Sequence, residues 1–164
     1  MIKFKKVEIE EIETLAQLAS KIWHEYWTVI LTPEQIDYMV GKFQSETAIK
    51  NQYANENYTY YFIKKNNEKI GYFGVSEKEN YLFLSKLYIL KDFRHQGIGK
   101  QAFEKIKEIA LEKKYSSIQL TVNKYNKNTI TAYDKWGFRT IDSVVTDIGQ
   151  GFVMDDYIME YAFS

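Results

Sequence analysis

The chain has 164 residues, the size of one folded domain, and we expect residues 1–164 to form a single domain. Its 22 basic and 22 acidic residues balance, which argues against nucleic acid or an anionic membrane surface as the main partner. The chain has no cysteine and only two histidines, which excludes disulfides and cysteine nucleophiles and disfavours a metal site. It shows no signal-peptide pattern and no bilayer-spanning apolar segment, which predicts a cytoplasmic protein.

In the first part of the chain, apolar and polar residues alternate over a short segment, and apolar residues then recur at helical spacing. These patterns predict a strand at 2–7, a helix at 10–23, a helix that begins at Thr32 and a short helix at 45–55. The second helix has the clearest start. Thr32 suits its N-cap, Pro33 suits its first position, and Gln35 completes a capping box.

The second part of the chain predicts strands at 58–65, 69–76 and 81–90, a helix at 97–113, a strand at 117–122, a helix that ends at Trp136, and strands at 138–145 and 153–163. Short turns join the first three strands, which implies an antiparallel meander. A helix joins 81–90 to 117–122, so this pair should lie parallel or splay apart. Asn126 or Asn128 is expected to cap the last helix, and Gly137 to end it.

The segment 87–100 passes from an apolar strand end, through a polar bend, into a helix. At such a bend the first backbone N–H groups of the helix lack partners and favour an anion. Gly97 and Gly99 leave room for a bulky phosphate, and Arg94, His95 and Lys100 can add charge or hydrogen bonds. We interpret the bend as a diphosphate cradle, and the alternative is an ordinary strand-to-helix turn. It matches neither the Walker loop nor the dinucleotide-binding motif, which disfavours a nucleotide-phosphate enzyme.

Two blocks of this sequence resemble a known enzyme family. The form Arg94-x-x-Gly97-x-Gly99 is similar to the acetyl-CoA-binding signature R/Q-x-x-G-x-G/A of the GCN5-related N-acetyltransferases (GNAT). That family's second block is matched by Asn123, Asn128, Tyr133 and the run Trp136-Gly137-Phe138. The resemblance implies an α/β (α+β) GNAT-like fold, with a mixed, mostly antiparallel sheet of about seven strands flanked by helices. A splayed parallel strand pair would hold the cofactor.

The resemblance also implies how acetyl-CoA, as the acetyl donor, is bound. Backbone groups of Leu87, Tyr88 and Ile89 would pair with the pantetheine arm. The diphosphate would be held by Arg94 and by the segment His95, Gln96, Gly97, Ile98, Gly99 and Lys100. The side-chain amides of Asn123 and Asn128 would lie on the cofactor side.

Tyr133 is the candidate general acid, because a phenol stays protonated at neutral pH and can give its proton to a departing thiolate. The alternative is that Tyr133 is one of many tyrosines in the core. The general base is not evident. Many relatives carry a glutamate where this chain has Ser85, and a serine cannot usefully take a proton from an ammonium group. A water chain, Glu25 or His24 would then serve.

By resemblance, the acceptor side is built from the first helices and the loop between the last strands. The candidates are His24, Glu25, Tyr26, Trp27 and Asp155, the last within the loop region 147–156. The tail 149–160 resembles small-amine and polyamine acetyltransferases, and aromatic rings with nearby carboxylates suit a cationic amine. The alternative acceptors are an amino acid, an antibiotic or a protein amine. The alternative for Asp155 and Asp156 is that they only cap or solvate an edge strand.

These observations predict an acetyl-CoA-dependent N-acetyltransferase in which a primary amine attacks the thioester directly. The expected partner is a small-molecule amine, with no nucleic acid, membrane or metal involved. The rival from another class is a non-catalytic acetyl-CoA-binding sensor domain, which the missing glutamate leaves open. A long aromatic C-terminal strand also suits a homodimer.

Overall fold

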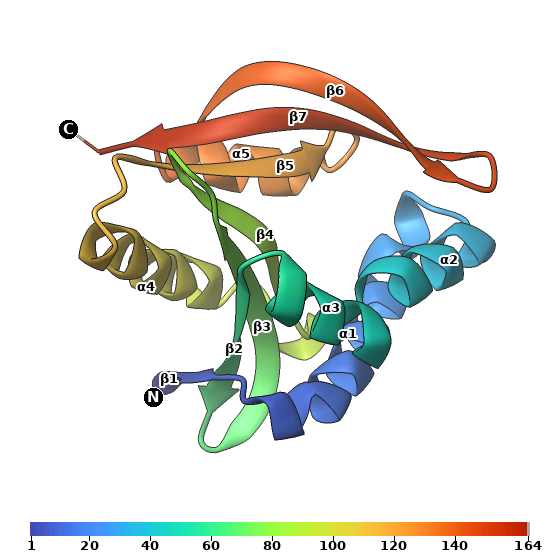
Figure 1. Ribbon diagram of the computed structural model, residues 1–164, viewed down its shortest axis with the longest axis horizontal. Coiled ribbons are helices and arrows are strands. Elements are labelled where there is room, and N and C mark those ends of the chain that lie inside the picture. Colours follow the sequence, from blue (N-terminus) through green and yellow to red (C-terminus); the bar gives the residue numbers. More distant parts are fainter. Residues whose placement is uncertain (164) are drawn as a thin grey trace.

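The computed structural model describes residues 1–163, apart from the side chain of Val29. Its main elements are β1 (Ile2–Lys6), α1 (Ile12–Tyr26), α2 (Pro33–Phe43), α3 (Glu46–Asn55), β2 (Tyr58–Lys65), β3 (Glu68–Glu77), β4 (Leu82–Ile89), α4 (Ile98–Glu112), β5 (Ser117–Asn123), α5 (Lys127–Lys135), β6 (Arg139–Gly149) and β7 (Phe152–Ala162) (Figure 1). Single 3-10 turns lie at Ile9–Glu11, Trp27–Val29 and Lys91–Phe93. The order of helices and strands is the predicted one, including the short third helix.

The described strands form one sheet in the order β1-β2-β3-β4-β5-β7-β6. All neighbours are antiparallel except β4 and β5, which are parallel because α4 crosses between them. The two strands pair only at Leu82 with Ile118 and at Phe83 with Gln119, and then diverge. The predicted splayed parallel pair is therefore confirmed, and β4 beyond Phe83 has an unpaired edge toward β5.

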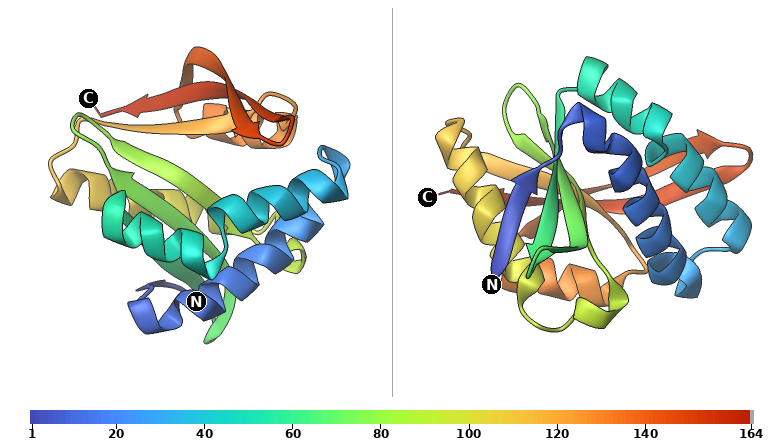
Figure 2. Two further views of the ribbon diagram at one scale, coloured as in Figure 1. Left: turned by 45° about the vertical axis from the view of Figure 1, so that its right-hand side comes forward. Right: turned by 90° about the horizontal axis from the view of Figure 1, so that it is seen from below.

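Helices cover both faces of the sheet and create two apolar cores (Figure 2). α4 and α5 pack on one face, where Phe103 and Tyr133 belong to the first core. α1, α2 and α3 pack on the other face. Successive side chains of the central strands point to opposite faces and so contribute to both cores: Phe73 belongs to the first core and its neighbour Tyr72 to the second. None of the helices in the described part of the chain combines the length and apolar character that a membrane span requires.

The end of the chain forms a longer hairpin than the sequence predicted. The region 147–151 was expected to be a loop, but β6 continues to Gly149 and β7 begins at Phe152. Gln150 and Gly151 make the turn with φ angles of 56° and 80°, and left-handed residues of this kind match the twist of a tight hairpin. The hairpin reaches α2, where the Tyr38 hydroxyl donates to the Ile148 carbonyl at 2.5 Å (Figure 1).

A chain of buried polar side chains ties α1 to the segments that follow α2. The indole N–H of Trp23 donates to the Tyr72 hydroxyl at 2.8 Å, and Tyr72 donates to Gln44 Oε1 at 2.6 Å. Gln44 continues the chain to the hydroxyl of Tyr60, which donates to Gln52 Oε1 at 2.6 Å. Each buried polar group thereby gains a partner, and the helical layer is held in one position on the sheet.

Candidate active site

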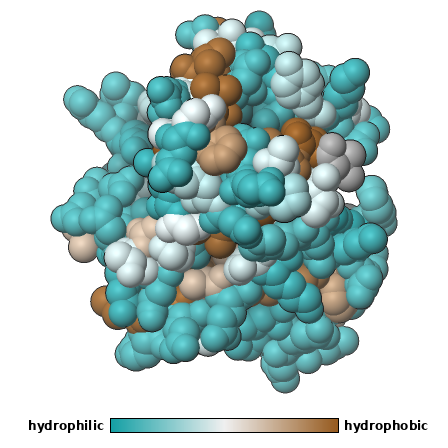
Figure 3. All heavy atoms as spheres, turned by 90° about the vertical axis from the view of Figure 1, so that its right-hand side faces the viewer, coloured by the Kyte–Doolittle hydropathy of each residue, from teal (hydrophilic) through white to brown (hydrophobic). Residues whose placement is uncertain are grey.

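A cavity opens where β4 and β5 diverge. Its walls come from α1 with the turn after it, α2, β4, β5, α5 and β7. Its polar and aromatic lining residues include Trp23, Tyr26, Trp27, Ser85, Lys86, Tyr88, Asn123, Asn126, Tyr133 and Asp156. Figure 3 shows the face of the molecule on the side of α2 and the β6–β7 turn, where small hydrophobic groups are scattered among hydrophilic residues. The cavity is lined by residues of both cores, among them Tyr133 of the first and Trp23 of the second.

The predicted cradle follows the diverging end of β4, after the 3-10 turn Lys91–Phe93 and at the start of α4. Gly97 is the N-cap of α4 with a φ of 76°, and no side chain caps the helix. A Cβ added at Gly97 would meet nothing within 4 Å, so the approach to the first N–H groups of α4 is open. Gly99 also has a packing role. A Cβ there would lie 3.3 Å from the Trp136 ring, so this glycine lets α4 pack against the residue that follows α5.

Arg94 turns back into the protein and does not extend toward solvent. Its Nε donates to the Ile89 carbonyl at 2.9 Å, and its guanidinium lies 4.8 Å from the centre of the Tyr26 ring. Glu25 Oε1 lies 3.8 Å from Arg94 Nη2 and accepts a hydrogen bond from the Lys91 N–H at 2.7 Å. Arg94 and Glu25 therefore shape the loop before the cradle, and the Ile89 carbonyl already has a partner.

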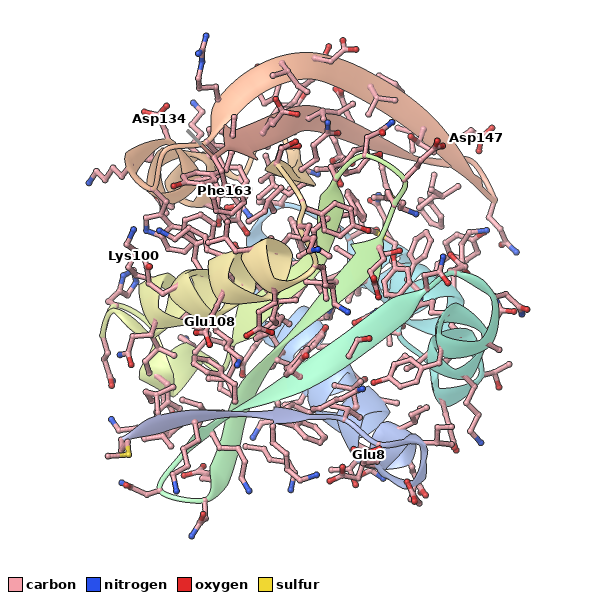
Figure 4. All side chains as sticks on the ribbon, turned by 60° about the vertical axis from the view of Figure 1, so that its left-hand side comes forward. Glu8, Lys100, Glu108, Asp134, Asp147 and Phe163 are labelled. Atoms are coloured by element: carbon pink, nitrogen blue, oxygen red, sulfur yellow. The ribbon has the colours of Figure 1, made fainter. Side chains whose placement is uncertain are left out.

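The remaining cradle residues differ in exposure. Ile98 is buried in the core below α4, whereas His95 is exposed with a φ of 64°. Gln96 Oε1 accepts a hydrogen bond from Lys65 Nζ at 3.2 Å. Lys100 lies in the first turn of α4, 3.3 Å from a Glu104 carboxylate oxygen, at the end of the helix near α5 (Figure 4). Lys100 is thus the exposed cation beside the bare helix start.

Tyr133 projects from α5 into the cavity and is 8% exposed. Its ring packs edge-on against Trp136 and in a tilted arrangement against Phe138, which fixes its direction. Burial raises the pKa of Tyr133 above its ordinary value, and the Tyr26 hydroxyl adds to this rise. A protonated phenol with no hydrogen-bond acceptor among the described residues is available as a proton donor.

The structure separates the two asparagines that the sequence put together. Asn123 lines the cavity, and its Oδ1 accepts from the Tyr125 N–H at 2.9 Å. Asn128 lies exposed in the first turn of α5 and does not line the cavity. Asn126, expected only as a cap, is the N-cap residue of α5, and its side chain donates to the Tyr26 hydroxyl at 2.7 Å. Asn126 therefore connects α5 to α1 across the opening.

Of the residues expected on the acceptor side, Tyr26 and Trp27 line the cavity. Together with Trp23 they surround the ring of Tyr88, at centroid distances of 5.4 to 6.3 Å. His24 does not reach the cavity, because α1 continues through it and its ring bonds Asp37 of α2, a contact that raises the pKa of His24. Neither His24 nor Glu25 lies where a base would act.

The acidic pair on β7 is divided between two environments, because successive side chains of a strand point to opposite faces. Asp155 does not line the cavity, and its Oδ1 lies 2.8 Å from Lys124 Nζ. Asp156 lines the cavity and is 5% exposed. Burial raises the pKa of Asp156 to about 6, and Asp155 adds to the rise. Asp156, and not the predicted Asp155, is therefore the acidic residue of β7 that faces the cavity.

Lys86 is a cavity residue that sequence reasoning missed. The register of β4 against β3 skips Ser85, so this residue forms a bulge beside Lys86. Lys86 Nζ donates to Ser85 Oγ at 2.9 Å, and the Tyr58 hydroxyl lies 2.9 Å from the same oxygen. Burial lowers the pKa of Lys86 to about 8 against the opposing effect of Asp156. The available signal was a single lysine within an otherwise apolar strand.

A family model described as the acetyltransferase (GNAT) family matches residues 13–138. The chain belongs to the GNAT acetyltransferases. As a member of that family it is an acyltransferase, and acetyl-CoA is its acetyl donor. The residues at the opening fit this donor. The free edge of β4 offers backbone groups to an extended arm, and Gly97 leaves the start of α4 bare for a diphosphate.

Two acetyltransferases illustrate the range of relatives. Spermidine N(1)-acetyltransferase of Thermoplasma acidophilum is 26% identical over 158 residues, which cover 94% of this chain and 96% of the relative. Thialysine N-epsilon-acetyltransferase of Bos taurus is 34% identical over 67 residues, which cover 40% of this chain and 39% of the relative. The first relative therefore spans nearly the whole chain, whereas the second is matched over less than half.

Solved structures reproduce the fold of this GNAT acetyltransferase. PaiA N-acetyltransferase from Thermoplasma acidophilum, in complex with coenzyme A, matches with a TM-score of 0.83 at 24% identity, over 99% of both chains. The ribosomal-protein-S18-alanine N-acetyltransferase of Escherichia coli matches with a TM-score of 0.70 at 16% identity, over 100% of this chain and 95% of the other. The GNAT fold predicted from the sequence is confirmed.

Proposed function

We propose that this GNAT acetyltransferase acetylates a primary amine of a small cationic molecule of the polyamine class. The single observation that carries the proposal is the convergence on one cavity of a buried phenol, an aromatic wall and a buried carboxylate. Aromatic faces and a carboxylate attract an alkylammonium group. The spermidine acetyltransferase that matches nearly the whole chain supports the same class of acceptor.

The cradle and the free edge of β4 hold the donor in this proposal. Backbone N–H groups at the start of α4 contact the diphosphate, with Lys100 as the adjacent cation. The backbone of Leu87 and Tyr88 contacts the arm along the unpaired edge. Arg94 contributes by holding the loop in shape through its Nε bond to Ile89 and its contact with Tyr26, while its Nη2 has no hydrogen-bond partner among the described residues.

Tyr133 acts as the general acid. The amine nitrogen attacks the thioester carbonyl, and the leaving sulfur needs a proton as its bond to carbon breaks. Tyr133 presents a protonated hydroxyl to the cavity and is held there by Trp136 and Phe138. Its proton therefore neutralises the thiolate at the moment of departure.

The acceptor enters beside α2 and the β6–β7 hairpin. This half of the cavity is lined by Gln35 and Met39 of α2 and by Val153 and Met154 of β7. Apolar walls suit the methylene segments of a polyamine, while Asp156 and the aromatic rings suit its charged amines. The homodimer, the cytoplasmic location and the single-domain organisation stay predictions from the sequence.

The test is turnover with a panel of acceptors: spermidine, spermine, lysine, thialysine and a peptide with a free N-terminus. Release of free CoA and the mass of the acetylated product identify the acceptor. We expect polyamines to give the highest kcat/KM. Preferential acetylation of the peptide, or CoA release with no acetylated amine, would contradict the proposal.

The variant Tyr133→Phe separates catalysis from binding. We expect it to lower kcat roughly a hundredfold while acetyl-CoA affinity stays unchanged, because only the proton donor is removed. Tyr115→Phe is the matched control, since the Tyr115 hydroxyl bonds the Lys78 carbonyl at the surface, outside the cavity. Equal kcat values for Tyr133→Phe and the unmodified protein would exclude Tyr133 as the acid.

A further inference from the structure

Asp156 is a buried carboxylate without a hydrogen-bond donor. It lies on β7 opposite Asn123 of β5 and Val144 of β6, and its side chain faces the cavity. The effects on its ionisation are burial and neighbouring charges, with no hydrogen bond from any residue in the described part of the chain. Asp156 is 5% exposed as a residue, and its side chain lines the cavity, so a carboxylate without a protein partner is costly here and points to a partner that enters the cavity.

The charged neighbours of Asp156 are all engaged elsewhere. Lys86 faces it from β4 but donates its hydrogen bonds to Ser85, and Lys124 beyond β5 pairs with Asp155. The other titratable groups that line the cavity are tyrosines, with Tyr88 on β4, Tyr26 on α1 and Tyr133 on α5. Lys86 and Lys124 favour the ionised form of Asp156, whereas Asp155 opposes it. The carboxylate is therefore kept available, but not neutralised by direct contact.

We propose that Asp156 is the general base, and that its carboxylate removes a proton from the ammonium group of the acceptor. This inference deepens the proposed function and depends on it. It fills the role left open by Ser85, whose hydroxyl is committed to Lys86 and Tyr58. Asp156 and Tyr133 line the same cavity from β7 and from α5, so the acid and the base reach the reacting groups from different walls.

The proton balance is complete with these two residues. The acceptor ammonium gives one proton to Asp156, and the neutral nitrogen forms a bond to the thioester carbonyl carbon. The carbon–sulfur bond breaks, and the sulfur takes the proton of Tyr133. The nitrogen then gives up a second proton, which restores the Tyr133 phenol. Asp156 releases its proton to solvent, so each turnover yields one amide, one free thiol and one proton.

The decisive variant is Asp156→Asn, which keeps the shape of the side chain and removes its basicity. At about pH 7 we expect kcat/KM to fall roughly a hundredfold, the usual contribution of one general base. Activity of the variant should recover about tenfold per pH unit up to the pKa of the acceptor amine, because hydroxide then supplies the free amine. Asp142→Asn, on the exposed strand β6, is the matched control with the same change of charge.

The pH profile distinguishes a base from a residue that merely binds the ammonium group. In the unmodified protein kcat should fall at acidic pH, where Asp156 takes up its own proton. This acidic limb should be absent from Asp156→Asn. A variant with a raised KM, an unchanged kcat and the same acidic limb would show that Asp156 only binds the amine, and the inference would be wrong.

Lys86→Met provides an independent measurement. Removing the nearby cation should raise the pKa of Asp156 further, so the acidic limb should move to higher pH while activity on the alkaline plateau is retained. If Lys86→Met abolished the limb and Asp156→Asn kept it, Lys86 would be the base and the inference would be overturned.

Failure of the inference can be distinguished from failure of the proposed function. If the unmodified protein acetylates no amine although it binds acetyl-CoA, both are wrong. If it acetylates an amine and Asp156→Asn is equally active at every pH, only the inference is wrong. Calorimetric titration with acetyl-CoA accompanies each variant, and we expect unchanged donor affinity for Asp156→Asn because its carboxylate lies on the acceptor side.

Discussion

Glu25 accepts a hydrogen bond from the backbone N–H of Lys91 at 2.7 Å. This contact joins the end of α1 to the turn that precedes the cradle, although the two residues are 66 positions apart. The same carboxylate lies 3.8 Å from the guanidinium of Arg94, which in turn bonds the end of β4. The loop that presents the start of α4 is therefore held from the opposite face of the sheet.

Glu25→Ala should weaken acetyl-CoA binding without changing the chemical step. Loss of one hydrogen bond to a carboxylate costs about 1 to 2 kcal/mol, which corresponds to roughly a tenfold lower affinity if the cost falls on the shape of the loop. Calorimetric titration measures the affinity, and kcat at saturating donor should stay within a factor of about two. A collapse of kcat with normal affinity would instead restore Glu25 as a candidate base.

The two cradle glycines should respond differently to substitution by alanine. Gly97 has a φ of 76°, so Gly97→Ala strains the backbone by about 1 kcal/mol and puts a methyl group at the bare helix start. We expect a clear loss of acetyl-CoA affinity. Gly99→Ala presses on Trp136 and should mainly lower the melting temperature. Equal effects of both variants on affinity and melting temperature would contradict this division of roles.

Tyr72→Phe should destabilise the protein by about 2 kcal/mol. The Tyr72 hydroxyl is fully buried, accepts from Trp23 and donates to Gln44, so its removal leaves two buried polar groups without partners. Chemical denaturation measures the change in the free energy of unfolding. Tyr115→Phe, at the surface, should change it by less than about 0.5 kcal/mol. A similar small change for Tyr72→Phe would mean that water replaces the lost hydroxyl.

Asp156 should make stability depend on pH in the direction opposite to that of a paired carboxylate. Its pKa is about 6 in the folded protein, above the ordinary value of 3.8, so the folded state binds its proton more tightly. The stability it contributes is therefore present below about pH 4 and is lost as the pH rises to about 6. At about pH 7.5 we expect Asp156→Asn to be more stable by on the order of 2 kcal/mol, and the difference to vanish in acid. Thermal denaturation across this range tests the sign.

Local patterns in the sequence were sufficient to predict the order of the helices and strands and the bare helix start of the cradle. The cradle is encoded by neighbouring residues, because an apolar strand end, Gly97 and an amphipathic helix together create the bare N–H groups. The splayed pair followed from the helix between β4 and β5, since a crossover forces parallel strands. The roles of Lys86 and Asp156 lay outside such patterns, because these residues are 70 positions apart and meet only across the opening.

By itself, the sequence determined the fold class, the family and the bare helix start at Gly97, because those features depend on short-range periodicity and on residues close together in the chain. Only the tertiary structure decided which acidic residue faces the cavity and what Glu25 does. The side chains of a strand alternate, so one step in register exchanges Asp155 for Asp156. The end of α1 meets the cradle loop only after both have packed around the sheet, and that contact converts Glu25 from a candidate base into an anchor.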